Sequence, residues 1–173
     1  MPKKGFYIGD LVLGANDGII TSFAVISGAA GAGLPAFVVI VLGLANLVAD
    51  GISMGLSNYL SLRSTKEAEL RVGVNETRLD HPSRHGLATG LAFASAGALP
   101  LIPYFFGIPP SAQFSVAIAA TAISLFVVGA SRTVVTGSHW LRSGIEMLVV
   151  GGLAALAAYI VGAAVRVFFG IAV

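Results

Sequence analysis

The sequence predicts an all-α integral membrane protein, with residues 1–173 forming a single transmembrane domain. Of its residues, 56% are hydrophobic and only 10% are charged, whereas soluble domains usually contain about 25% charged residues. The mean hydropathy is correspondingly high, at +0.90. Five apolar stretches are each long enough to cross a hydrocarbon core, which takes about 20 residues. They cover residues 6–32, 34–62, 86–106, 111–130 and 143–168.

Composition also excludes several kinds of site. The formal net charge of +2 arises from few charges, which we interpret as membrane-orientation signals and not as a nucleic-acid surface. The chain contains no cysteine, so disulfides, thiolate metal sites and cysteine nucleophiles are excluded. The sequence has no nucleophile elbow, zinc-binding helix or glycine-rich phosphate loop, and we therefore expect no enzyme.

The centre of the first stretch carries an acid, Asp17, between Gly14 and Gly18. An ionised group at the bilayer centre costs about 2.5 to 3.5 kcal/mol on insertion scales, so an intramembrane acid indicates a functional site. The GxxxG step lets another helix approach at the level of the acid. At about 100° per residue, Asp10 and Thr21 fall on the same helical face as Asp17. Two lysines precede this stretch, as in a signal peptide, but its length and its acids favour a retained helix.

The second stretch follows a tight Gly/Pro turn and carries a second polar stripe. Its members recur at helical spacing: Asn46, Asp50, Ser53 and Ser57, with Met54 beside them. At 1.5 Å per residue, Asp17 lies about 16 Å inside the membrane, and Met54 and Asp50 lie about 12 and 18 Å inside from the same face. We therefore expect two carboxylates and a thioether at similar depth on neighbouring antiparallel helices.

The only long polar segment, residues 63–85, lies between the second and third stretches, and we expect it to be a cytoplasmic loop. Its acids and histidines form a candidate set for capturing metal at the cytoplasmic mouth: Glu67, Glu69, Glu76, Asp80, His81 and His85. The alternative is a solvated loop with helix-extending ion pairs, such as Glu67 with Arg71.

The third and fourth stretches contain no acid. Residues 86–106 and 111–130 are joined by a Gly/Pro turn, and a short amphipathic link, residues 132–142, leads to the fifth stretch. Glu146, in the first turn of that stretch, is expected to pair with Arg142 four residues earlier.

The basic residues predict that the N-terminus is cytoplasmic. An odd number of spans puts the termini on opposite sides, and nearly all Lys and Arg residues fall on the N-terminal side: Lys3, Lys4, Arg63, Lys66, Arg71, Arg78, Arg84, Arg132 and Arg142. By the positive-inside rule this side faces the cytoplasm. Only Arg166 lies toward the other side, where we expect its side chain to snorkel to the surface.

Asp17, Asp50 and Met54 together favour a site for a divalent transition metal. Carboxylates bind hard cations and a thioether favours softer ones, so this donor set favours ferrous iron or manganese over magnesium or calcium. Metal ions and protons compete for the same oxygens, which makes proton-coupled exchange a natural hypothesis. Two alternatives stay open: Met54 packs as an ordinary apolar side chain, and the acids hold helices together through hydrogen bonds.

Three segments resemble the vacuolar iron transporter family, also called the iron and manganese transporter family, in a short prokaryotic form that lacks a cytoplasmic metal-binding domain. The segments are residues 14–21 (GANDGIIT), residues 49–61 (ADGISMGLSNYLS), and residues 142–148 (RSGIEML) with the glycines at 151 and 152. The resemblance covers nearly the whole chain.

The resemblance implies a five-helix protomer that works as a homodimer and exports ferrous iron, and often manganese, from the cytoplasm in exchange for protons. It implies a path along the dimer interface, lined by the first helix of each protomer. Asp17 matches the family's mid-membrane acid, Met54 its partner, and Asp10 an acid nearer the cytoplasmic entrance.

Two departures from the family pattern stand out. Asn46 falls where better-known members carry a glutamate on the second helix, so this chain has one titratable ligand fewer there or uses Asp50 instead. Eukaryotic members insert a cytoplasmic domain rich in Glu and Met between the second and third helices, whereas residues 63–85 of this chain contain no Met.

We therefore expect a homodimeric transporter of ferrous iron or manganese in a prokaryotic inner membrane, with the metal as cargo and no cofactor. Asp17 and Met54 of both protomers would form the central site, Asp10 the entrance, and Asp50 and Asn46 a second layer or proton relay. The alternative is a membrane metal sensor or scaffold that binds metal without moving it. Polar residues thin out toward the far side, so either the protein is closed there or small residues line the path: Ser27, Gly28 and Gly31.

Overall fold

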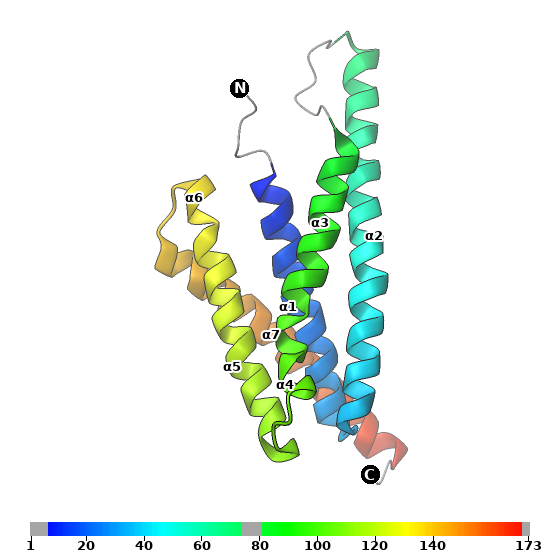
Figure 1. Cartoon of the computed structure of the whole chain (residues 1–173), viewed down its shortest axis with the longest axis vertical. Helices are drawn as coiled ribbons and strands as arrows, with labels where there is room; N and C mark the ends of the chain where they lie inside the picture. Colours follow the sequence, from blue (N-terminus) through cyan, green and yellow to red (C-terminus); the bar gives the residue numbers. More distant parts are fainter. Residues whose placement is uncertain (1–6, 74–80, 171–173) are drawn as a thin grey trace.

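The computed structural model describes residues 7–73 and 81–170, and within these ranges the chain is a helical bundle without strands (Figure 1). Five helical segments are long and apolar enough to cross a membrane. They are α1 (Ile8–Ala32), α2 (Ala36–Arg71), α3 with its short continuation (Pro82–Phe105), α5 (Pro110–Ser131) and α7 (Trp140–Phe169). The predicted fold class is confirmed, and the two termini lie at opposite ends of the bundle.

Helix α2 is much longer than its apolar part. Its 36 residues extend for about 54 Å at 1.5 Å per residue, against a hydrocarbon core of about 30 Å. The surplus projects beyond the bundle at the end that holds the N-terminus (Figure 1). We infer that this projection lies outside the membrane.

The predicted loop over residues 63–85 is therefore wrong at both of its ends. Helix α2 continues to Arg71, supported by an ion pair between Arg63 Nε and Glu67 Oε1 at 2.8 Å. This pair replaces the expected pair of Glu67 with Arg71. Helix α3 begins at Pro82, since proline fits the first helical position, where no backbone N–H is needed.

The third span is interrupted. Helix α3 (Pro82–Gly97) is followed by a single 3₁₀ turn, η1 (Leu99–Leu101), and a short helix, α4 (Ile102–Phe105). Pro100 and Pro103 both lack the amide hydrogen that a continuous helix would need at these positions. The sequence predicted one continuous stretch here, and the two prolines explain the difference.

Helix α1 occupies the centre of the bundle, packed against α3 and α7 and also against α5 and α2. Its Ile19 and Ile26 are fully buried. Phe23 belongs to the main core cluster together with Phe93 of α3 and Leu101 of η1. The helix that carries Asp10 and Asp17 is thus the one that every other span touches.

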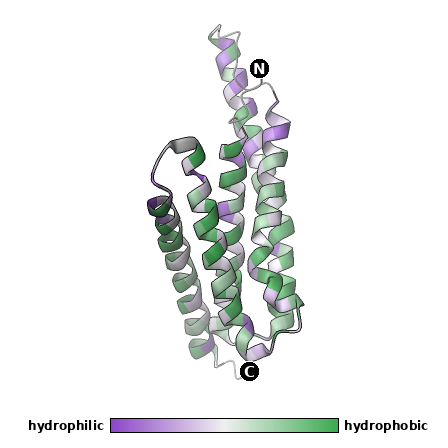
Figure 2. Cartoon of the chain, turned by 60° about the vertical axis from the view of Figure 1, so that its left-hand side comes forward, coloured by the Kyte–Doolittle hydropathy of each residue, from purple (hydrophilic) through white to green (hydrophobic). Residues whose placement is uncertain are grey.

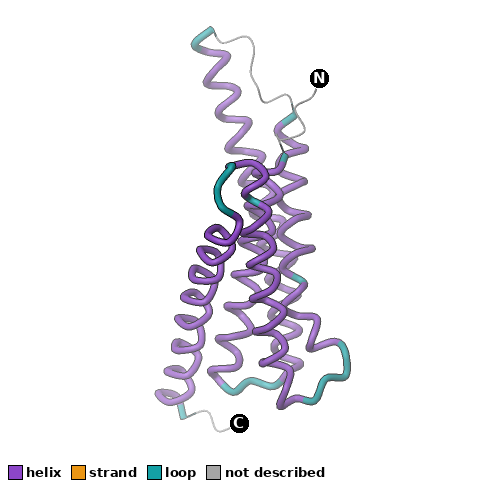
Figure 3. Tube along the Cα trace, turned by 90° about the vertical axis from the view of Figure 1, so that its left-hand side faces the viewer, coloured by secondary structure: helices purple, strands orange, loops and turns teal. Residues whose placement is uncertain are grey.

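The surface divides into apolar sides and a polar end. Large apolar side chains are exposed on the outer faces of α2, α5 and α7, for example Val48, Val127 and Leu153 at 61%, 58% and 63%, as expected for helices that face lipid. Figure 2 shows hydrophilic residues gathered at the end with the N-terminus and the α2 projection. The connections lie mainly at the two ends of the bundle (Figure 3).

Two expectations about charged residues are met. Arg142 Nε pairs with Glu146 Oε1 at 3.1 Å. The exposed Arg166 lies beside Gly33, where α1 ends, at the end of the bundle opposite the N-terminus.

Candidate functional site

The GxxxG step of α1 packs directly on α3. A Cβ atom at Gly14 would collide with the main-chain oxygen of Thr89, and one at Gly18 would collide with that of Phe93. Glycine is required at both positions because the two backbones touch. The predicted close approach at the level of Asp17 therefore exists, and α3 is the partner.

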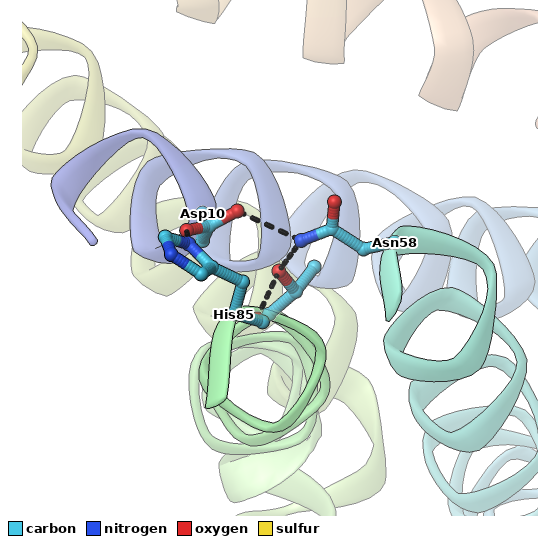
Figure 4. A network of polar contacts seen from close by, with 4 residues as sticks. Asp10, Asn58 and His85 are labelled. Carbon is cyan, nitrogen blue, oxygen red and sulfur yellow. Dashed lines mark hydrogen bonds and ion pairs between the residues drawn. The ribbon is translucent and has the colours of Figure 1, made fainter. Parts of the chain in front are cut away.

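Asp10, in the first turn of α1, is held by side chains from α2 and α3 (Figure 4). Its Oδ1 accepts a hydrogen bond from Asn58 Nδ2 at 2.7 Å, and its Oδ2 lies 2.5 Å from His85 Nδ1. The same Asn58 nitrogen lies 2.7 Å from Thr89 Oγ1, which donates to the main-chain oxygen of His85 at 3.0 Å. Both carboxylate oxygens of Asp10 are thus engaged, and three helices meet at this acid.

This network is largely shielded. The side chains of His85 and Asp10 are 4% and 13% exposed. The ring of Tyr7 stacks on the His85 ring, with centroids 4.5 Å apart and planes inclined by 26°. Charge-assisted hydrogen bonds are strong in such an environment because water competes little for them.

Asp17 lies two helical turns further into the membrane. It lies close enough to Asp50 of α2 for the two acids to interact electrostatically. Thr21 Oγ1 donates to the main-chain oxygen of Asp17 at 2.8 Å and not to its carboxylate. Within residues 7–73 and 81–170, no side chain donates a hydrogen bond to the Asp17 carboxylate.

Asp50 has a neighbour on its own helix. Asn46 Nδ2 donates to Asp50 Oδ2, one turn away. The side-chain oxygen of Asn46, Oδ1, is buried and accepts no hydrogen bond from the described part of the chain. An amide oxygen of this kind is a suitable ligand for a hard or borderline cation.

Met54 is half-buried and packs against the main core cluster. This placement agrees with ordinary apolar packing, and it also keeps the thioether on the part of α2 between Asp50 and Asn58.

The face of α2 beside these polar groups has no partner in the chain. Small and polar side chains recur along it and are all exposed: Ala45, Ala49, Ser53 and Ser57. Asn46 and Asp50 lie at its edge and are half-buried.

The candidate capture residues do not form one cluster. Glu67 is exposed and paired with Arg63, whereas one oxygen of Glu69 is buried without a hydrogen-bond partner among the described residues. His81 is exposed and precedes α3. His85 belongs to the Asp10 network, and Glu76 and Asp80 lie outside the described residues.

Sequence reasoning missed two members of the Asp10 network, Asn58 and Thr89. Their signals are visible in retrospect, because Asn58 lies one turn after Met54 on α2 and Thr89 lies one turn after His85 on α3. Within residues 7–73 and 81–170, no three His, Asp or Glu side chains converge on one point. A metal site built from this single chain therefore needs amide, hydroxyl or main-chain oxygens as well.

The far half of α1 is closed by packing. A Cβ atom at Gly31 would collide with the main-chain oxygen of Tyr159, and Gly28 is in backbone contact with Gly162. Ser27 is 1% exposed. These small residues serve helix packing within this chain, and both closure of this side and a path along it stay predictions.

Five helices long and apolar enough to cross a membrane, two of which carry the interacting acids Asp17 and Asp50, are typical of an integral membrane protein. The model of the VIT family matches residues 8–73 and 68–163. The chain belongs to the VIT family. The two matched stretches overlap at residues 68–73, around the end of α2 at Arg71.

Curated relatives agree with this assignment. The vacuolar iron transporter homolog 1 of Oryza sativa subsp. japonica is 32% identical, over 86% of this chain and 69% of that protein. The vacuolar iron transporter 1 of Tulipa gesneriana is 28% identical, over 91% and 86%, and that of Arabidopsis thaliana is 27% identical, over 90% and 84%. The alignment with the tulip protein covers 214 positions, more than the 173 residues of this chain, so the relative has residues that this chain lacks.

Proposed function

We propose that the chain is one protomer of a homodimeric transporter that moves ferrous iron or manganese out of the cytoplasm in exchange for protons. The observation that supports this proposal is that Asp17 of α1 and Asp50 of α2, two acids on apolar helices, lie close enough to interact electrostatically. Asp17 also has no hydrogen-bond donor among the described side chains. A divalent ion between the two acids offsets their repulsion, and so does a proton on either one. Because only one of these fits at a time, binding of the ion and release of protons are linked.

The unpartnered face of α2 supports the dimer. Polar groups that face hydrocarbon are costly, so intramembrane polar residues are normally covered by protein or line a cavity. A second copy placed against this face would cover it and would bring two sets of acids together around a two-fold axis. In such a dimer, Asp17 and Met54 of both protomers form the central site, with Asp50 and Asn46 as a second layer or proton relay.

The charge distribution supports an orientation of the protein in the membrane, on which the proposed direction of transport rests. Six Lys or Arg residues of the described ranges lie at the end with the N-terminus, which the positive-inside rule assigns to the cytoplasm: Arg63, Lys66, Arg71, Arg84, Arg132 and Arg142. Asp10 then lies at the cytoplasmic entrance. We propose a prokaryotic plasma membrane as the location, although the relatives named above are plant proteins with vacuolar names.

A second candidate function is favoured by the closed far side. Within this chain α1 and α7 are in backbone contact at Gly28 and Gly31, and a metal sensor or scaffold needs no opening on this side, whereas a transporter needs a path across it. The two functions differ in one observable, namely passage of the ion across the membrane.

Ion uptake into proteoliposomes tests the proposal. The wild-type protein should take up Fe²⁺ or Mn²⁺ and reject Mg²⁺, and Asp17→Asn should abolish uptake while the purified variant keeps its helical content and oligomeric state. Wild-type uptake by the variant would disprove the central role of Asp17.

A further inference from the structure

We propose that Asp10, His85, Asn58 and Thr89 form a second metal site, at which a divalent transition-metal ion is first bound before it reaches the acids in the membrane. This inference rests on the proposed function, because it assigns the same cargo to a second position. It goes beyond that function by naming the ligands and the selectivity of the entrance.

The donor atoms form a continuous chain of short contacts from His85 through Asp10 and Asn58 to Thr89. The two oxygens of Asp10 contact His85 Nδ1 at 2.5 Å and Asn58 Nδ2 at 2.7 Å, and Thr89 Oγ1 lies 2.7 Å from the same Asn58 nitrogen. Two ligands at right angles around an ion, each at about 2.1 Å, lie about 3 Å apart. Small shifts of these side chains therefore convert hydrogen-bonding distances into distances suitable for a metal.

The chemical change on binding is simple. The carboxylate of Asp10 is already an anion and needs no change to act as a ligand. Neutral His85 offers the Nδ1 lone pair once its proton resides on Nε2, and a half-turn of the Asn58 amide presents Oδ1 in place of Nδ2. The ion would then lie beside the Asp10 carboxylate, where it replaces the hydrogen atom shared with His85, and no oxidant or other reactant is required.

The nitrogen ligand gives this site its selectivity. Mg²⁺ and Ca²⁺ prefer oxygen ligands, whereas imidazole suits first-row transition metals. An entrance that contains one imidazole among oxygen donors therefore discriminates against Mg²⁺. The mid-membrane acids alone would discriminate less.

The position of the site suits transfer of the ion inward. Asp10 and Asp17 lie on one face of α1, about 10 Å apart along the helix axis at 1.5 Å per residue. Asn58 and Asp50 lie on α2 at matching levels, since α1 and α2 run antiparallel. An ion that leaves the first site therefore reaches the second along the same pair of helices.

A purely structural role for the network is the competing explanation. The same hydrogen bonds join three helices and would stabilise the bundle without any metal. The two explanations differ in whether a nitrogen of this chain coordinates a bound ion.

Pulsed EPR of bound Mn²⁺ tests the proposal in the full-length protein carrying Asp17→Asn, which removes the mid-membrane acid. We expect Mn²⁺ to bind and its echo to be modulated by a coordinated nitrogen. His85→Gln should remove the modulation and weaken Mn²⁺ binding about tenfold. His139→Asn, which changes a histidine outside the network, should leave both unchanged.

A second variant keeps the test decisive if His85→Gln does not fold. Asn58→Asp adds a carboxylate beside Asp10. If the network is a metal site, this variant should bind Mn²⁺ more tightly, and Mn²⁺ should raise the Tm of the protein more with this substitution than without it. A purely structural network would lose stability through repulsion of the two acids and gain nothing from Mn²⁺. Absence of a nitrogen signal, or its persistence in His85→Gln, would overturn the proposal. Absence of ion flux through the wild-type protein, with the nitrogen signal intact in the EPR experiment, would instead contradict the transport function and leave this site in place.

Discussion

Two acids on the same face of α1 have different surroundings. Asp10 has both oxygens engaged by Asn58 and His85, whereas Asp17 has a repelling acid, Asp50, and no donor to its carboxylate in the described ranges. The first arrangement holds a carboxylate in a fixed position. The second stores repulsion that a cation or proton relieves. At the scale of single residues, this contrast is the basis on which we propose Asp10 for the entrance and Asp17 for the central site.

The repulsion has a measurable consequence for stability. Asp50→Asn should stabilise the metal-free protein by about 1 kcal/mol, which corresponds to a rise in Tm of about 2–4 °C for a chain of this size. Thermal unfolding in detergent measures this. Glu146→Gln, at an exposed ion pair, serves as the control, and an equal gain in both variants would contradict the expectation.

The residues of the mid-membrane pair could be predicted from the sequence, because an acid inside an apolar stretch is conspicuous. The Asp10 network could not be predicted in full. His85 was assigned to the loop, although Pro82 three residues earlier indicates a helix start, and Asn58 and Thr89 are neutral residues whose role depends on which helices meet. Packing of three helices decides that, and one sequence does not reveal it.

At the scale of elements, α1 and α3 are held at backbone contact by glycine. Gly18→Ala should destabilise the protein by about 1–3 kcal/mol, because the added methyl group collides with the main chain of Phe93 and neither backbone has room to yield. Gly152→Ala on α7 is the matched control, since nothing lies within 4 Å of its Cβ position. The control should gain about 0.5–1 kcal/mol from helix propensity. Similar Tm values for the two variants would disprove the close contact.

Substitutions in the α2 projection test whether acids outside the membrane capture metal. Glu67 is engaged by Arg63, whereas one buried oxygen of Glu69 accepts no hydrogen bond from the described residues. We therefore expect Glu69→Gln to raise the Mn²⁺ concentration for half-maximal uptake about twofold or more, and Glu67→Gln to leave it unchanged. Initial uptake rates over a series of Mn²⁺ concentrations give both values. Equal values for both variants and the wild type would exclude capture by Glu69.

Most elements could be predicted from hydropathy because crossing a membrane demands about 20 apolar residues. The same criterion explains why the end of α2 and the interruption of the third span were not predicted. It ends α2 at the first charges, although charged residues paired one turn apart continue a helix in water, as Arg63 and Glu67 do. It also takes no account of Pro100 and Pro103, which are apolar and interrupt the third span.

At the scale of the whole molecule, the proposed dimer depends on the bare face of α2. The chain has no cysteine, so single substitutions allow clean cross-linking. Ala49→Cys or Ser53→Cys should give covalent dimers under mild oxidation in the membrane, because these side chains are exposed in the single chain and would lie near the two-fold axis. Val127→Cys, exposed on the outer face of α5 at 58%, should give none. Dimers in all three variants, or only in the α5 variant, would place the interface elsewhere.

The overall architecture could be predicted from one chain because each span satisfies its own backbone hydrogen bonds and its apolar surface needs only lipid. The partner of a polar face cannot be predicted in the same way. Small residues such as Ala45, Ala49 and Ser53 do not by themselves indicate a contact surface. Their exposure becomes evident only when the other four spans are placed.

The most direct test of the whole account is Mn²⁺ and Fe²⁺ flux into proteoliposomes with an acidic interior, compared with vesicles without a pH gradient, for the wild type and Asp17→Asn. The account predicts that outward-moving protons drive ion uptake by the wild type, that uptake is slower without the gradient, and that the variant takes up none. Binding of the ions to the wild-type protein without uptake in either condition would contradict transport, and the protein would then act as a metal sensor or scaffold.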